Sequence, residues 1–170
     1  KLYGAVAQYA NDLIGFLKAA PAANAAADKA VGPFVLKDLT KVGPKPGGSS
    51  QGGMYEDANG QKWIVKSYPT AGMAQNEVLA ANLYAACGLP VPEMRLVDLG
   101  GQYHGGMGVA SKVIDEPLAK IDLKNKAQMS AAHAGFAAHA ALANWDTVGM
   151  SFDNLMIGTK TGKAYMVDPG

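Results

Sequence analysis

Residues 62–87 read KWIVKSYPTAGMAQNEVLAANLYAAC, and this stretch decides the fold class. Its first part, residues 62–68, is mostly β-branched or aromatic, which is typical of a strand. A helix over residues 71–87 would carry one apolar stripe, made of Val78, Leu79, Leu83 and Tyr84. Gly88 follows as a helix C-cap. The stretch therefore predicts a strand followed directly by an amphipathic helix.

Strand and helix patterns alternate on both sides of this stretch. Before it, two short apolar runs are separated from the strand at 62–68 by a turn that contains Asn59-Gly60, the strongest short signal for a hairpin. After it come strand character around a Gly-rich turn and an Ala-rich helix. The predicted elements outside 62–87 are strands at 34–36 and 53–56, strand character over 91–114, a helix over 127–143, and a closing hairpin with strands 155–157 and 164–167.

This order predicts an α+β fold, with an antiparallel sheet, one packed helix, a helical segment and a closing β-hairpin. Residues 1–18 predict a further amphipathic helix, and the Ala-rich stretch that follows it is either a linker or a short second helix. We therefore divide the chain into an N-terminal arm and linker, 1–32, a sheet-bearing part, 33–115, and a closing part, 116–170. The chain begins with Lys1 rather than Met, so we expect a processed or partial product.

The composition excludes several functional classes. The 170 residues are 49% hydrophobic and carry a formal net charge of +1, so no global field draws the chain onto nucleic acid or anionic lipid. No apolar run is long enough to span a bilayer, and no signal-peptide pattern is present. Cys87, the only cysteine, excludes an internal disulfide and is interpreted as a small core residue. We expect a soluble protein.

A glycine-rich segment between two predicted strands is the first candidate site. It contains Gly47, Gly48, Ser49, Ser50, Gln51, Gly52 and Gly53. A backbone with few side chains can approach a polyphosphate and direct its N–H groups toward it. The same composition also fits a flexible hairpin loop, and the segment alone leaves both interpretations open.

Lys66 and Glu77 form the second candidate. Lys66 lies inside the apolar strand, where an unpaired ammonium group is costly to bury. Glu77 lies in the second turn of the next helix, from which it could reach Lys66. We predict an ion pair between them, whereas a glutamate in a helix is more commonly a solvated residue.

The third candidate is at the C-terminal end, where Asn154 and Asp168 flank the predicted hairpin and would meet at its open end. Amide and carboxylate oxygens are ligands suited to Mg²⁺. Asp146, eight residues before Asn154, could orient or deprotonate an attacking hydroxyl, with Asp153 as a competitor for that role. His133 and His139 lie on nearly opposite helix faces and are interpreted as structural.

These residues together resemble the protein-kinase-like superfamily, over residues 34–170. GGSSQGGMYED resembles a glycine-rich loop, Lys66 the strand lysine that contacts phosphates, and Glu77 its helix partner. DNLMI and VDPG are similar to the stretch from the metal-binding Asn to the metal-binding Asp of D-F-G. There is no H-R-D motif, and Pro169 replaces the aromatic residue, as in a divergent member closer to HipA-like toxin kinases and type II phosphatidylinositol 4-kinases.

The resemblance implies a kinase-like N-lobe over 33–115 and a truncated helical C-lobe over 116–170. It also implies ATP and Mg²⁺ as ligands, with nucleotide contacts from the glycine segment, Lys66 and Glu77. Two functions stay open: an ATP- and Mg²⁺-dependent phosphotransferase of unknown acceptor, located in the cytoplasm, or a kinase-like module with a structural or interaction role. The second would belong to a phage particle, and so be virion-associated, or to a larger multidomain protein. The protein partners would then include the missing C-terminal portion of the chain.

Overall fold

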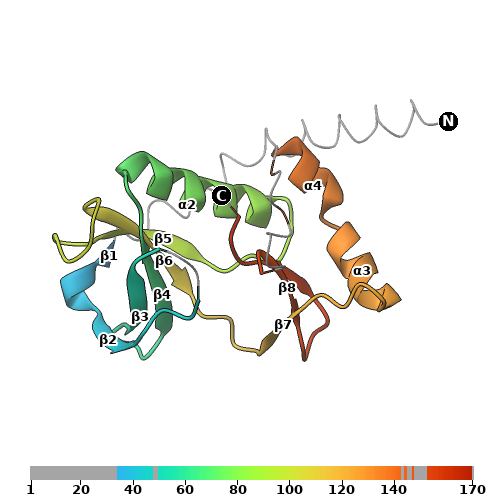
Figure 1. Ribbon diagram of the computed structural model, residues 1–170, viewed down its shortest axis with the longest axis horizontal. Coiled ribbons are helices and arrows are strands. Elements are labelled where there is room, and N and C mark those ends of the chain that lie inside the picture. Colours follow the sequence, from blue (N-terminus) through green and yellow to red (C-terminus); the bar gives the residue numbers. More distant parts are fainter. Residues whose placement is uncertain (1–33, 48–49, 143, 145–146, 148–152, 170) are drawn as a thin grey trace. The chain divides into compact units, whose positions relative to one another are not determined.

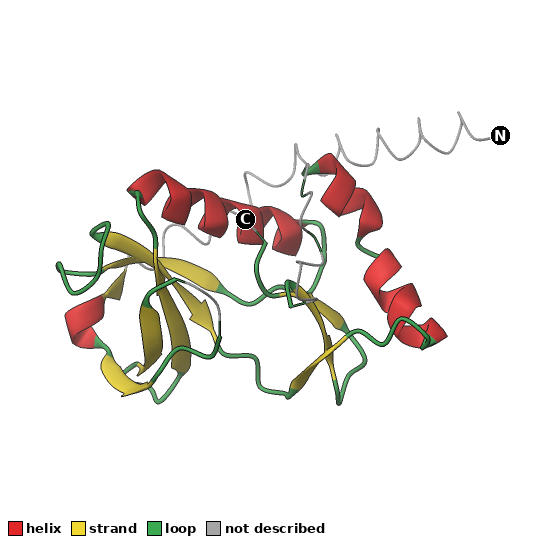
Figure 2. Cartoon of the chain, in the orientation of Figure 1, coloured by secondary structure: helices red, strands yellow, loops and turns green. Residues whose placement is uncertain are grey.

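The computed structural model describes residues 34–47, 50–142, 144, 147 and 153–169. All of them belong to one compact unit, residues 33–170. The predicted helix over 1–18 and the arm and linker of 1–32 lie outside the described residues. The unit has an α+β fold with a six-stranded sheet and a three-stranded sheet (Figures 1 and 2).

The larger sheet has the strand order β1-β5-β6-β4-β3-β2. All of its neighbours are antiparallel except β1 and β5, which run parallel, so the sheet is mixed rather than antiparallel throughout as predicted. From β1 the chain passes through a 3-10 turn, Leu36–Asp38, to β2 at the opposite edge of the sheet. The strands are β1 Phe34–Val35, β2 Thr40–Gly43, β3 Gly52–Glu56, β4 Lys62–Ser67, β5 Met94–Asp98 and β6 Met107–Lys112.

Strand alternation gives the two faces of this sheet different roles. On one face, Trp63 and Val65 of β4 pack with Tyr55 and the turn residues Leu36 and Leu39 in a buried cluster. The other face of the sheet carries helix α2, Ala71–Ala86, as Figure 1 shows. Because successive side chains of a strand point to opposite faces, Ile64 and Lys66 lie on the α2 side.

Helix α2 begins at the N-cap Thr70, whose hydroxyl accepts a hydrogen bond from the backbone N–H of Met73. Its buried residues are Ala74, Glu77, Ala81 and Tyr84. The predicted stripe is therefore wrong at Leu79, whose side chain is 53% exposed. Small alanines lie on the buried face instead and bring the helix close to the sheet.

The smaller sheet joins β7, Leu118–Lys120, to the closing hairpin of β8, Leu155–Gly158, and β9, Ala164–Met166. The hairpin was predicted, whereas β7 was not. Tyr84 of α2 packs with apolar residues of this hairpin in one buried cluster. The backbone N–H of Met166 also donates to the Pro90 carbonyl, 2.9 Å away, which ties β9 to the segment that follows α2.

The Ala-rich segment forms two helices rather than the single helix predicted over 127–143. Helix α3 spans Lys126–His133 and helix α4 spans Phe136–Ala141. The break falls at Gly135, where an added Cβ would lie 2.7 Å from Nε2 of His139. The buried histidine thus requires a glycine at this point, and a glycine weakens a continuing helix.

Candidate functional site

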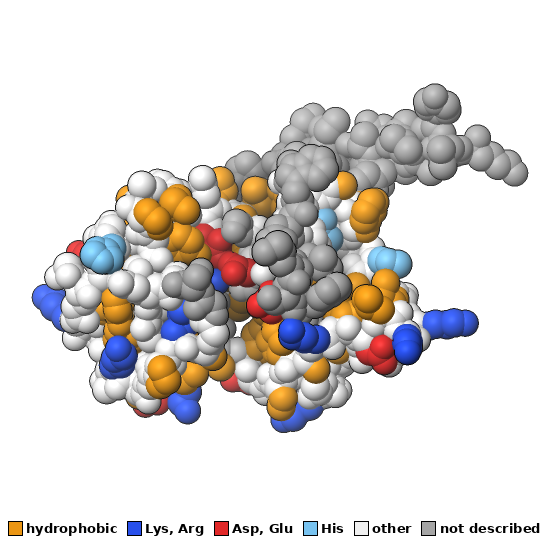
Figure 3. Space-filling model, viewed as in Figure 1, with side chains coloured by type: hydrophobic (Ala, Val, Ile, Leu, Met, Phe, Trp, Pro, Cys, Tyr) orange, Lys and Arg blue, Asp and Glu red, His pale blue; other side chains and the backbone are white. Residues whose placement is uncertain are grey.

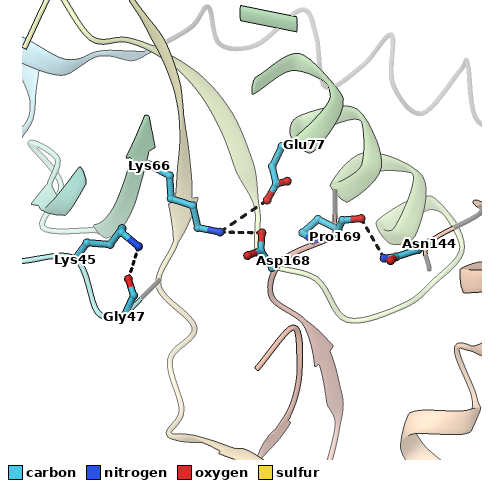
Figure 4. A network of polar contacts seen from close by, with 7 residues as sticks. All are labelled: Lys45, Gly47, Lys66, Glu77, Asn144, Asp168 and Pro169. Atoms are coloured by element: carbon cyan, nitrogen blue, oxygen red, sulfur yellow. Dashed lines mark hydrogen bonds and ion pairs between the residues drawn. The ribbon is translucent and has the colours of Figure 1, made fainter. Parts of the chain in front are cut away.

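Lys66 is at the centre of a charged cluster built from three separate elements. Its ammonium Nζ lies 2.9 Å from Oδ1 of Asp168 and 3.9 Å from Oε1 of Glu77 (Figure 4). The predicted Lys66–Glu77 ion pair is thus present. The shorter contact, to Asp168, joins β4 to the residue that follows the closing hairpin, 102 positions away in the chain.

Glu77 is the buried member of the cluster, with 2% of its side chain exposed. Its Oε1 is buried and accepts no hydrogen bond. Burial raises the pKa of Glu77 to about 8, the Asp168 carboxylate adds to this increase, and the Lys66 charge opposes it. The folded protein therefore holds a proton on this carboxyl more readily than an exposed glutamate does.

Asn154 and Asp168 lie at the same end of the β8–β9 hairpin. Leu155 pairs with Met166, and the backbone N–H of Val167 donates to the Asn154 carbonyl at 2.8 Å. Asn154 is therefore opposite Val167, one residue before Asp168. This arrangement agrees with the placement predicted from the hairpin pattern.

Lys66, Asn154 and Asp168 line a cavity of about 500 Å³. Its charged and polar lining includes Lys45, Lys66, Asp153, Asn154 and Asp168. Its apolar lining includes Ile64, Pro92, Val113, Ile114, Leu118 and Met156. Figure 3 shows acidic and basic side chains lying beside each other near the middle of one face of the molecule. An apolar wall next to opposite charges suits a ligand with a flat apolar part and an anionic part.

The glycine-rich segment is only partly a loop. Gly47 lines the cavity and has a φ of +70°, a conformation that favours glycine. Gly52 and Gly53 lie in β3, and an added Cβ at Gly52 would collide with the Val65 carbonyl oxygen. The glycine at position 52 is therefore explained by the close approach of two strands.

The middle of the segment gives less support to the predicted phosphate contacts. The Gln51 carbonyl accepts hydrogen bonds from the backbone N–H and the hydroxyl of Ser67, so it extends the β3–β4 pairing. Ser50 is half-buried. Gly48 and Ser49 lie outside the described residues, and so does Asp146, the predicted base.

Lys45 is a cavity residue that the sequence analysis missed. Its ammonium donates a hydrogen bond to the Gly47 carbonyl (Figure 4). Burial lowers the pKa of Lys45, repulsion from Lys66 lowers it further, and Asp168 acts in the opposite direction. The sequence does contain a sign of this role. Lys45 lies between Pro44 and Pro46, which restrict the backbone on both sides of it, and the glycine-rich segment begins right after Pro46.

A second polar network connects α2 and α4 to the C-terminal residues. The Tyr84 hydroxyl lies 2.9 Å from Nδ1 of His139 and accepts from the Asn144 amide at 3.0 Å. The same amide donates to the Pro169 carbonyl at 3.2 Å (Figure 4). Burial lowers the pKa of His139. Its predicted structural role is confirmed, whereas His133 is exposed.

Within the described ranges, no group of three or more His, Cys, Asp or Glu residues could hold a metal ion. No helix in the described part of the chain is both long and apolar enough to cross a membrane.

A comparison of the sequence with known protein families gives no match, and a comparison with curated proteins gives none either. The geometry of the cavity is therefore the basis on which a function can be assigned.

Proposed function

We propose that the chain binds a nucleoside polyphosphate together with Mg²⁺ in the cavity lined by Lys66 and Asp168, and that it acts as an atypical kinase-like phosphotransferase. The observation that carries this proposal is the cluster of Lys66, Glu77 and Asp168, two of which, Lys66 and Asp168, line a cavity that also has an apolar wall. A polyphosphate would replace Asp168 as the anionic partner of Lys66.

The donor set fits Mg²⁺. This ion is usually held by one or two protein oxygens, with phosphates and water completing the coordination. Asp168 is 43% exposed and shares the cavity with Asn154, so hard oxygen ligands are available without a three-carboxylate cluster. When bound, the ion would neutralise phosphate charge. Asp168 and Asn154 would hold it.

The chain's own residues would position the reacting group. Lys66 would hold the phosphates, and Glu77 would keep the lysine directed into the cavity because its carboxyl group is fixed on α2. Asp146 is the proposed base for the acceptor hydroxyl.

A second candidate function is a kinase-like module with a structural or interaction role. The observation that favours it is that Lys66 already contacts two carboxylates of the chain itself, so the ammonium is compensated without any ligand. In that case the cluster would serve to fasten β4, α2 and the end of β9 together.

Titration calorimetry on the 170-residue chain tests the proposal, with ATP in the presence and absence of Mg²⁺. We expect binding that requires the metal and that Asp168→Asn abolishes, because the variant removes a negatively charged ligand. Asp115→Asn is the matched control, since it removes the same charge from an exposed residue that does not line the cavity. Circular dichroism confirms that each variant is folded.

Asp146→Ala separates binding from transfer. We expect it to bind ATP and Mg²⁺ like the wild type and to lose ADP formation, because its proposed partner is the acceptor hydroxyl. A folded wild-type protein that gives no heat with ATP and Mg²⁺ would contradict the phosphotransferase and leave the structural module as the better interpretation.

A further inference from the structure

Lys45 reaches the cavity across a strand that carries no side chain at the crossing point. An added Cβ at Gly52 would lie 3.3 Å from Cδ of Lys45, closer than most side-chain contacts. The aliphatic stem of Lys45 therefore packs against β3 beside Gly52, where a side chain would crowd it as well as the Val65 carbonyl. Pro44 and Pro46 restrict the backbone on either side of the lysine. The lysine is held at the cavity by the fold and is not simply a flexible surface residue.

The charge of Lys45 is not compensated as that of Lys66 is. Its hydrogen-bond acceptor is the neutral Gly47 carbonyl, and it forms no ion pair with any residue that the structure describes. The Asp168 carboxylate acts on it from a distance, but Oδ1 of that group is in contact with Lys66. A second cation beside Lys66, half-buried and without a carboxylate partner, is unfavourable unless an anion joins it.

The arrangement of acids reinforces this asymmetry. Glu77 and Asp168 both lie on the Lys66 side of the cluster, and the buried Oε1 of Glu77 accepts no hydrogen bond although it faces the lysine (Figure 4). A ligand that carried a single anionic group could be held by Lys66 alone. A ligand with several linked anionic groups would also reach Lys45, which lines the same cavity.

We propose that Lys45 is a second anion-contacting residue and that, with Lys66, it makes the cavity selective for ligands with two or more linked phosphate groups over those with one. This inference rests on the proposed function and names the ligand class of the same cavity. The proposed selectivity concerns only the linked phosphate groups of the ligand. An inorganic polyphosphate therefore tests it without a nucleoside.

The experiment measures binding of inorganic tripolyphosphate and of inorganic phosphate to the 170-residue chain by calorimetry, without divalent metal and at one fixed ionic strength. Lys45→Met keeps the aliphatic stem and removes the charge. We expect it to weaken tripolyphosphate binding at least tenfold, or about 1.4 kcal/mol, and to change phosphate binding less than about twofold. Lys37→Met is the control, because it removes the same charge from an exposed lysine that does not line this cavity.

Lys45→Arg gives a second test that does not depend on the stability of the methionine variant. It keeps the charge, so we expect tripolyphosphate affinity within about threefold of the wild type. The proposal is overturned if the wild type does not bind tripolyphosphate, if Lys37→Met weakens binding as much as Lys45→Met, or if Lys45→Met weakens phosphate and tripolyphosphate equally.

A parallel titration with ATP and with adenosine separates this inference from the proposed function. Tripolyphosphate binding that depends on Lys45, without any ATP binding, would support the polyphosphate site and contradict the nucleotide-dependent activity. ATP binding that is unchanged in Lys45→Met would overturn the role of Lys45 and leave the proposed function intact.

Discussion

The protonation of Glu77 predicts how the stability of the protein depends on pH. The substitution Glu77→Gln keeps the shape of the side chain but cannot ionise. In the folded protein the carboxyl has a pKa of about 8, against an ordinary value of 4.5. The folded state therefore binds more protons than the unfolded state between these two values, and this group's contribution to the unfolding free energy decreases as the pH rises through that window.

The magnitude follows from the difference between the two pKa values. It corresponds to about 4 kcal/mol lost from pH 4.5 to pH 8, of which about 3 kcal/mol is lost by pH 7. Glu77→Gln should remove this loss, so the variant should be more stable than the wild type by a few kcal/mol at pH 8 and of similar stability near pH 4.5. Other groups such as His139, whose lowered pKa acts in the opposite direction, cancel in the comparison.

Urea unfolding at several pH values, without divalent metal, measures this difference through tryptophan fluorescence, to which Trp63, buried in the core, contributes. Glu56→Gln is the control, because it removes a glutamate of β3 that lies outside the cluster, and it should keep the pH dependence of the wild type. The reasoning is refuted if the difference between wild type and Glu77→Gln does not grow with pH across this window.

Two further substitutions test the packing around the site. Gly52→Ala should lower the unfolding free energy by more than about 2 kcal/mol, because its Cβ would collide with the Val65 carbonyl. Gly72→Ala should instead raise the stability slightly, because no atom lies closer than 4.0 Å to the added Cβ. Equal thermal denaturation of the two variants would contradict this reasoning. Tyr84→Phe should cost about 1–3 kcal/mol in chemical denaturation, since it leaves the buried ring nitrogen of His139 without its partner; an unchanged midpoint would show that the hydroxyl is dispensable.

Sequence patterns within one segment predicted those elements whose formation depends mainly on the residues of that segment. The alternation at 62–68 and the Asn59-Gly60 turn gave the β3–β4 hairpin, and Gly60 has the positive φ that such a turn requires. Pairings between distant segments were not predictable in this way. Strand β7, with three residues, is defined by its pairing with β8 about forty positions later, and the parallel β1–β5 pair joins segments about sixty positions apart.

The buried face of α2 explains why the apolar stripe predicted for this helix was wrong at Leu79. A large apolar side chain at position 79 looked like core, but the sheet accepts alanines and one glutamate there, and Leu79 is left exposed. Burial depends on how closely the two elements approach, which hydrophobicity alone does not encode. The same closeness makes the Glu77 carboxyl an internal partner of Lys66.

The part of the site that could be predicted is the one in which a buried charge needs a group of opposite charge. A lysine inside an apolar strand required a counter-charge, and this reasoning found Glu77. Lys45 was missed because its segment has the composition of a loop, and only the structure shows that its side chain packs against β3 at Gly52 and lines the cavity. The glycine at position 52 was assigned to a ligand, whereas the approach of the Val65 carbonyl accounts for it.

The hydrogen bond from Met166 to the Pro90 carbonyl has a mechanical consequence for the charged cluster. Helix α2 carries Glu77 directly, and through the segment after its C-terminal end it also holds the strand that leads to Asp168. Glu77 and the strand that leads to Asp168 are therefore both attached to α2, whereas Lys66 belongs to the large sheet. A small slide of the helix over the sheet would change both distances to the ammonium together, so the three charges would separate or close as a unit.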